Sequence, residues 1–142
     1  MVGRHLPPVV SDDPLPRLRS LCMALPEATE KLSHGSPTWF VRRVFVTYAD
    51  HHHGDPRTGF WCAAPPGAQE ALVASRPQVY YRPPYVGHRG WLGVNLDALA
   101  TGDVDWDEIA EVVTDAYRET APKRLVAVLD SSTVGDGRLA GT

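Results

Sequence analysis

Two β-rich runs that are separated by only two residues constrain the fold most strongly. The runs are Thr38–Val41 and Val44–Tyr48, and Arg42-Arg43 is the whole connection between them. So short a connection is typical of a β-hairpin, in which the strands are antiparallel. Arginine is disfavoured at the positive φ of the tightest hairpin turns, so a looser turn is an alternative. The segment therefore predicts a mainly antiparallel sheet.

Helical periodicity and capping signals flank these runs. Leucines recur at helical spacing from Leu15 onward, after an Asp-Asp-Pro start signal, and predict a helix that stops near Pro26. Asp105 and Glu108 form a capping box, which predicts the start of another helix that Pro122 ends.

Two shorter helical segments are also predicted. The first lies between Pro66 and Ser75, with its apolar side formed by Ala68, Ala71 and Leu72. The second lies at Leu125–Leu129.

The segment Trp91–Leu96 alternates between two sets of side chains, which predicts a strand. One set consists of leucine and valine and predicts a buried face. The other set, Trp91, Gly93 and Asn95, is only partly polar, so its face is exposed, carries a ligand or is covered by a loop. Two further strands are predicted at Glu30–Ser33 and Phe60–Ala63.

This order of elements predicts the α+β class, a single compact domain with helices packed against a mainly antiparallel sheet. We expect the domain at residues 14–130, between flexible tails at 1–13 and 131–142. No apolar run approaches the roughly 20 residues that span a bilayer, and the N-terminus lacks signal-peptide features. We therefore expect a cytoplasmic protein with no membrane partner, in which Cys22 and Cys62 are reduced.

Charge is unevenly distributed along the chain. The net charge is -3 with histidine neutral, whereas nucleic-acid-binding domains are usually basic. Residues 31–101 nevertheless hold seven basic and four acidic side chains, and residues 102–121 hold one basic and seven acidic ones. This split leaves room for one basic face on an acidic molecule. A solvated acidic helix is the other explanation.

The stretch RPPYVGHRGW, residues 82–91, mixes rings with cationic side chains. Rings stack on nucleic-acid bases, arginines pair with phosphates, and prolines stiffen a loop before it binds. In the structural alternative, the aromatic residues cover a sheet edge and the glycines turn the chain. Together with the hairpin tip, the stretch supplies the candidate binding residues Arg42, Arg43, Arg82, Tyr85, His88, Arg89 and Trp91.

Two other patterns in the sequence are weaker indications of a functional site. The run His51–His53 with Asp55 offers metal-ligating side chains, but neighbours in an extended loop point in different directions and no second ligand cluster follows. We expect no metal site. Glu30 and His34 could form a proton-transfer pair. In the structural alternative, Glu27 caps or salt-bridges near the helix end and His34 satisfies a turn.

Recognisable catalytic and cofactor motifs are absent from the sequence. It has no P-loop, no paired C-x-x-C, and no glycine fingerprint that follows a strand and opens a helix. We therefore expect no catalytic residue and no cofactor.

Three segments in order resemble the MmcQ/YjbR family, namely LPEATEKLSHGSPTWFVRRVFVTY, RPPYVGHRGWLGVNLD and DWDEIAEVVTDAYRETAPKRL. The resemblance covers roughly residues 14 to 130. It implies a CyaY-like domain with a double-wing, DNA-binding-like arrangement, and it brings no established reaction and no catalytic residues. The Arg42-Arg43 hairpin would be one wing and the Pro83–Trp91 segment the other.

The leading expectation is a non-enzymatic binding domain whose partner is nucleic acid, with DNA implied by the resemblance. A small-molecule or peptide-binding module is the first alternative, and it requires a concave, mostly apolar pocket lined by Trp91 and the Tyr80–Tyr85 loop. An enzyme that uses Glu30 and His34 is the most distant alternative, and it needs these side chains to converge in a cleft.

Overall fold

The computed structural model describes residues 13–51 and 57–131. Within them, six strands form one sheet in the order β1-β2-β3-β4-β6-β5, and every neighbouring pair is antiparallel. The strands are β1 Thr29–Ser33, β2 Ser36–Val41, β3 Arg43–Asp50, β4 Thr58–Cys62, β5 Tyr80–Tyr81 and β6 Leu92–Asn95.

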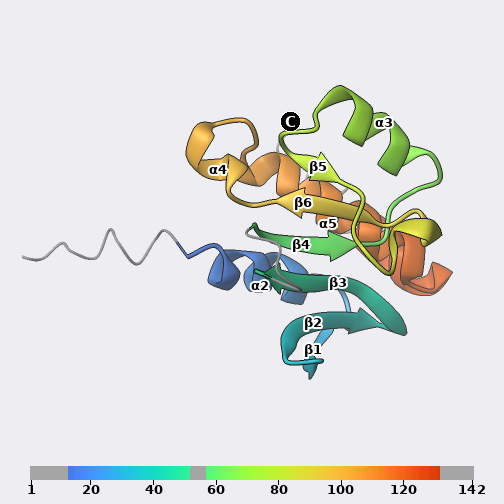
Figure 1. The fold of residues 1–142 in the computed structure, drawn as a ribbon. Helices are drawn as coiled ribbons and strands as arrows, with labels where there is room; N and C mark the ends of the chain where they lie inside the picture. The colour runs from blue at the N-terminus through green and yellow to red at the C-terminus, as the bar shows by residue number, and fades with distance from the viewer. Residues whose placement is uncertain (1–12, 52–56, 132–142) are drawn as a thin grey trace, which may run out of the picture.

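Helices cover one face and one edge of this sheet, which confirms the expected α+β class. They are α2 Leu15–Met23, α3 Ala68–Ser75, α4 Ala98–Thr101 and α5 Trp106–Thr120, and residues 123–131 are also helical. In Figure 1, α5 (orange) runs behind the sheet in contact with α2 (blue), and α3 lies at the β5 edge. None of the helices in the described ranges is long and apolar enough to cross a membrane.

The core lies between the sheet and the helices α2 and α5. Trp39, Val46 and Cys62 form one row across β2, β3 and β4, and all three are fully buried. Phe45 contacts Tyr117 of α5 edge to face, with ring centroids 5.6 Å apart. Replacing a buried aromatic residue of this kind by alanine costs roughly 3–5 kcal/mol. This face of the sheet is therefore fixed to the helices, and the opposite face is turned away from them.

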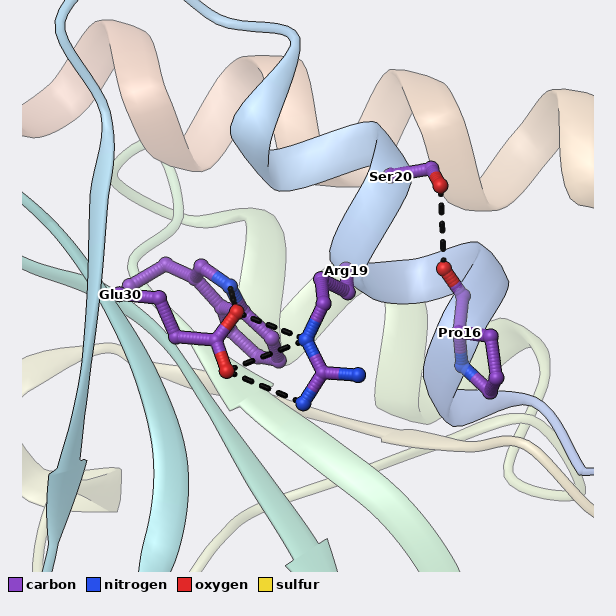
Figure 2. Close-up of polar contacts among 5 residues, drawn as sticks. Pro16, Arg19, Ser20 and Glu30 are labelled. Carbon is purple, nitrogen blue, oxygen red and sulfur yellow. Dashed lines mark hydrogen bonds and ion pairs between the residues drawn. The ribbon is translucent and has the colours of Figure 1, made fainter.

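Glu30 of β1 joins α2 to the sheet (Figure 2). Arg19 of α2 donates from Nε and Nη2 to the Glu30 carboxylate at 2.8 and 3.0 Å, and Trp39 Nε1 donates to it at 2.9 Å. The hydrogen bond from Arg19 is the main cause that lowers the pKa of Glu30. The carboxylate therefore remains charged and satisfied at neutral pH.

Both of the hairpin turns at β2 use positive φ. His34 and Gly35 connect β1 to β2 with φ of 52° and 81°, the signs of the type I′ turn favoured in two-residue hairpins. Arg42 connects β2 to β3 with φ of 65°, because Arg43 already belongs to β3. The predicted hairpin is confirmed, but the looser turn is not found. A register shift near this turn gives β3 one extra residue, and the added twist of such a bulge accompanies the tight connection.

The helix ends follow several of the signals in the sequence. Asp105 Oδ1 accepts a hydrogen bond from the Glu108 backbone N–H at 2.9 Å, which confirms Asp105 as the N-cap of α5. The Glu108 carboxylate does not complete a capping box, because it accepts from Arg76 and Tyr80. At the start of α2, Asp13 Oδ1 accepts from the Leu15 N–H at 3.0 Å. This helix stops at Met23, before the expected proline, and the chain then turns toward β1.

Candidate functional site

The face of the sheet that is turned away from α2 and α5 forms the floor of a groove of about 1180 Å³. Thr38 and Phe40 of β2, Thr47 of β3 and Trp61 of β4 contribute to this floor, and residues 85–91 supply a wall. The volume is slightly above the roughly 300–1,000 Å³ of typical small-molecule pockets. The groove is therefore large enough for a ligand with several chemical groups.

Three arginines line this groove and give it a positive charge. Arg42 and Arg43 belong to the β2–β3 hairpin, and Arg89 belongs to the short 3-10 helix η2, Gly87–Arg89. All three side chains are exposed. Among the described residues that line the groove, Glu119 is the only acid. A basic region thus exists on a chain whose net charge is -3.

The structure brings most of the predicted site residues together. The ones that line the groove are Arg42, Arg43, Tyr85, Arg89 and Trp91. Arg82 instead packs on Gly87, where an added Cβ would lie 2.6 Å from the Arg82 Cγ. His88 is exposed and does not belong to the groove lining.

Trp91 contributes to the groove mainly by supporting Arg89. The Trp91 side chain is buried, with 7% of the residue exposed, and the Arg89 guanidinium carbon lies 5.3 Å from its ring centroid. This is cation–π geometry, which orients the guanidinium over the ring. Tyr85, in contrast, is 66% exposed. The two aromatic residues of the wall therefore differ in how much ring surface a ligand can reach.

The second face of β6 is covered by an aromatic ring. An added Cβ at Gly93 would lie 2.4 Å from a carbon of the Tyr81 ring, so only glycine leaves room for this ring. Trp61 Nε1 donates to the Tyr81 hydroxyl at 3.1 Å, and the Arg57 guanidinium carbon lies 3.6 Å from the ring centroid. This face is therefore covered at Gly93, but by a ring of the neighbouring strand β5 and not by a loop.

Gln69 of α3 fixes the wall of the groove. Its side chain is buried, and Nε2 donates to the Gly87 carbonyl at 2.8 Å and to the Trp91 carbonyl at 2.5 Å. The predicted apolar side of this helix, Ala68, Ala71 and Leu72, is right in part, because Leu72 packs against the core, but it omits Gln69, the buried residue of the helix. Ala71 is exposed and the other two are only partly buried, because the helix packs at the β5 edge and turns Gln69 toward the loop.

Backbone strain is concentrated around the groove. Five non-glycine residues in the described ranges have φ in the left-handed region, and His34, Arg42 and Tyr85 among them line the groove. Such backbone conformations cost of order 1–3 kcal/mol each and are frequent at binding sites. The Tyr85 backbone, with φ of 67°, thus holds an exposed ring in a strained position.

The floor of the groove contains three residues that no pattern in the sequence indicated. Phe40, Thr47 and Trp61 were missed because their strands are largely apolar on both faces, so alternation did not reveal which face is open. Thr38 Oγ1 donates to the Ser36 carbonyl at 3.0 Å and lies 2.8 Å from Thr47 Oγ1. The hydroxyl pair leaves a polar spot on an otherwise aromatic floor.

The proposed proton-transfer pair is not brought together. Glu30 is bound by Arg19 and Trp39 on the helix side of the sheet, whereas His34 lines the groove. Glu27 forms an ion pair with Arg124 at 3.1 Å, in agreement with the structural alternative.

Only His51 of the histidine run lies within the described residues. His51 Nδ1 lies 2.6 Å from Asp50 Oδ1, and His52, His53 and Asp55 lie outside the described residues. Within residues 13–51 and 57–131, no group of three or more His, Cys, Asp or Glu side chains could hold a metal ion.

Comparison with known proteins agrees with this fold. The sequence model of the YjbR family matches residues 23–119. The crystal structure of the Deinococcus radiodurans protein DR2400, which has a DUF419 domain, is similar with a TM-score of 0.60 and 22% identity, over 72% of this chain and 75% of that one. No curated protein matches this chain. Because the family match runs from the end of α2 through nearly all of α5, the chain belongs to the YjbR family.

Proposed function

We propose that the groove binds nucleic acid and that the chain is a non-enzymatic binding domain. One observation carries this proposal: three arginines and the exposed ring of Tyr85, from segments far apart in the sequence, line a single groove. Arginine pairs with phosphate, and aromatic side chains stack on bases. In this proposal the Arg42-Arg43 hairpin and the Pro83–Trp91 segment serve as the two wings that the family resemblance implies.

The proposed ligand is DNA. We also propose that the protein is cytoplasmic, and the state of its two cysteines supports this location. Cys22 and Cys62 are free and buried, and burial raises the pKa of both thiols. Unpaired, unreactive cysteines suit a reducing compartment, where nucleic acid is also found.

Fluorescence anisotropy of labelled single- and double-stranded DNA, at about 50 and 200 mM salt, tests the proposal. We expect binding that weakens as salt rises, because each neutralised phosphate releases counterions. Arg42→Ala and Arg89→Ala should each reduce the salt slope by about 0.7–0.9. Lys123→Ala is the control, because Lys123 is exposed and does not line the groove. The absence of binding to both forms at the lower salt would rule the proposal out.

A small molecule or a peptide is the second candidate ligand. The groove is concave, Phe40 and Trp61 form the aromatic part of its floor, and Trp91 lines it as this alternative required, with Tyr85 from the Tyr80–Tyr85 loop. Thermal-shift measurements with mononucleotides and short peptides distinguish the candidates. A ligand that stabilises the protein equally at both salt concentrations, with no binding of DNA, would favour this second candidate.

A further inference from the structure

We infer that the groove selects an unpaired nucleic-acid strand over a duplex. This inference rests on the proposed function and specifies the form of its ligand. It is carried by the small number of cations at the groove, the position of the accessible rings and the rigidity of the wall.

The number of cations is too small for strong duplex binding. A duplex-binding protein gains most of its affinity from phosphate contacts, often 6–10 of them. Here Arg42, Arg43 and Arg89 line the groove, together with the carboxylate of Glu119. The chain as a whole carries a net charge of -3 and repels a polyanion at longer range. Most of the affinity must therefore come from contacts other than those to phosphate.

The rings that a ligand can reach are suited to unpaired bases. Tyr85 is 66% exposed on the wall. Phe40 is partly exposed on the floor, with the Lys31 ammonium 4.8 Å from its ring centroid. In a duplex the base faces stack on one another between two backbones, and neither ring could reach them. In a single strand each base has a free face, and stacking on an aromatic side chain contributes about 1–3 kcal/mol per base. Stacking on Tyr85, and on Phe40 once a base displaces the Lys31 ammonium from its ring, compensates for the few arginines.

The other rings at the groove act as supports rather than as stacking surfaces. Trp61 and Trp91 are each 7% exposed. The indole of Trp61 donates to the Tyr81 hydroxyl, and the ring of Trp91 lies under the Arg89 guanidinium. They hold Tyr81 and Arg89 in place and present little free ring surface to a base.

The wall is rigid before any ligand binds. Pro83 and Pro84 precede Tyr85, and Gln69 holds the carbonyl groups of Gly87 and Trp91. A loop that is ordered in advance loses less conformational entropy on binding. The exposed ring is therefore positioned for a flexible strand, which can adapt its backbone to the groove more easily than a stiff duplex can.

The test is a competition between one DNA strand of about 20 nucleotides, without self-complementarity, and the duplex of the same sequence. We expect the single strand to bind at least tenfold more tightly at about 50 mM salt. The slope of log K against log salt should be near −2, because each of three phosphate contacts contributes about 0.7 for a single strand.

Substitutions of Tyr85 and Phe40 measure the contribution of stacking to the affinity separately from the contribution of charge. Tyr85→Ala and Phe40→Leu should each weaken single-strand binding by about 5- to 150-fold, the equivalent of 1–3 kcal/mol, and leave the salt slope unchanged. Tyr85→Phe keeps the ring and should bind as the unmodified protein does. Leu32→Ala is the control for losing an exposed apolar side chain, because Leu32 is 73% exposed and outside the groove lining.

The possible outcomes are distinguishable. Duplex binding as tight as single-strand binding overturns the inference and leaves the proposed function standing. Unchanged single-strand affinity in both Tyr85→Ala and Phe40→Leu also overturns the inference. No binding of either form overturns the inference and the proposed function together. Phe40→Leu retains an apolar side chain on the floor, and circular dichroism confirms that each variant is folded.

Discussion

The side-chain amide of Gln69 donates a hydrogen bond to the Trp91 carbonyl, which joins helix α3 to the start of strand β6 across 22 residues of sequence. The same amide nitrogen also binds the Gly87 carbonyl. One buried side chain thus holds the backbone at the first residue of η2 and two residues beyond its end. The position of Arg89, which lies between them, depends on this link.

Gln69→Leu should destabilise the protein by about 1–3 kcal/mol, because two buried carbonyl groups lose their donor. Urea unfolding measures this change in the free energy of unfolding. Gln78→Leu is the matched control, because Gln78 is exposed, and it should change stability by no more than about 0.5 kcal/mol. Equal stability of the two variants would show that the link from Gln69 does not hold the wall.

Glu30→Gln should remove part of the acid dependence of stability. The pKa of Glu30 is lowered, mainly by Arg19, so the folded protein keeps this carboxylate ionised to lower pH than the unfolded chain does. Its stabilisation is present above about pH 4.3, the ordinary pKa of glutamate, and is lost as the pH falls through the lower folded value. Urea unfolding between pH 7 and 3 should therefore show a shallower loss of stability in the variant.

Glu27→Gln provides the comparison for that experiment. Glu27 also pairs with an arginine, Arg124, but both side chains are well exposed, so water screens the interaction. We expect the pH profile of this variant to follow that of the unmodified protein closely. A larger effect from Glu27 than from Glu30 would contradict the assignment of Glu30 as the link between α2 and the sheet.

Gly93→Ala should destabilise the protein by about 1–3 kcal/mol, because the new Cβ would overlap the Tyr81 ring. The effect should nearly vanish when Tyr81 is also replaced by alanine. Thermal unfolding of the two single variants and the double variant gives the interaction energy directly. Additive losses would mean that the ring does not occupy the space over Gly93.

Replacements of Arg42 should separate backbone strain from binding. Arg42→Gly relieves the positive φ and Arg42→Ala does not, so the glycine variant should be more stable than the alanine variant by about 1–2 kcal/mol. Both variants lack the guanidinium and should bind DNA equally weakly. Unfolding and anisotropy measurements on the same two samples test both statements. Equal stability would argue against strain at this turn.

Much of the fold follows from local signals. The hairpin at Arg42, the N-cap at Asp105 and the turn at His34 are each set by a few neighbouring residues, and the structure confirms them. Helix α4 and the two-residue strand β5 were not predicted as separate elements. They depend on tertiary packing, because so few residues carry little periodicity of their own.

The site was harder to predict, because its residues come from separate elements. The basic and aromatic loop was visible as a cluster in the sequence, and most of its selected residues line the groove. The contribution of Phe40, Thr47 and Trp61 depends on which face of the sheet α2 and α5 cover. The role of Gln69 depends on the orientation of α3. Neither of these is encoded in a local pattern.

The cation–π contact of Arg89 with Trp91 also gives the protein an intrinsic optical reporter. A phosphate that draws the guanidinium away changes the electric field at the indole, and with it the emission of Trp91. The chain has four tryptophans, so the difference spectrum between the unmodified protein and Trp91→Phe isolates this signal. Ligand engagement at the groove could then be followed in real time without any label, even before the ligand's identity is known.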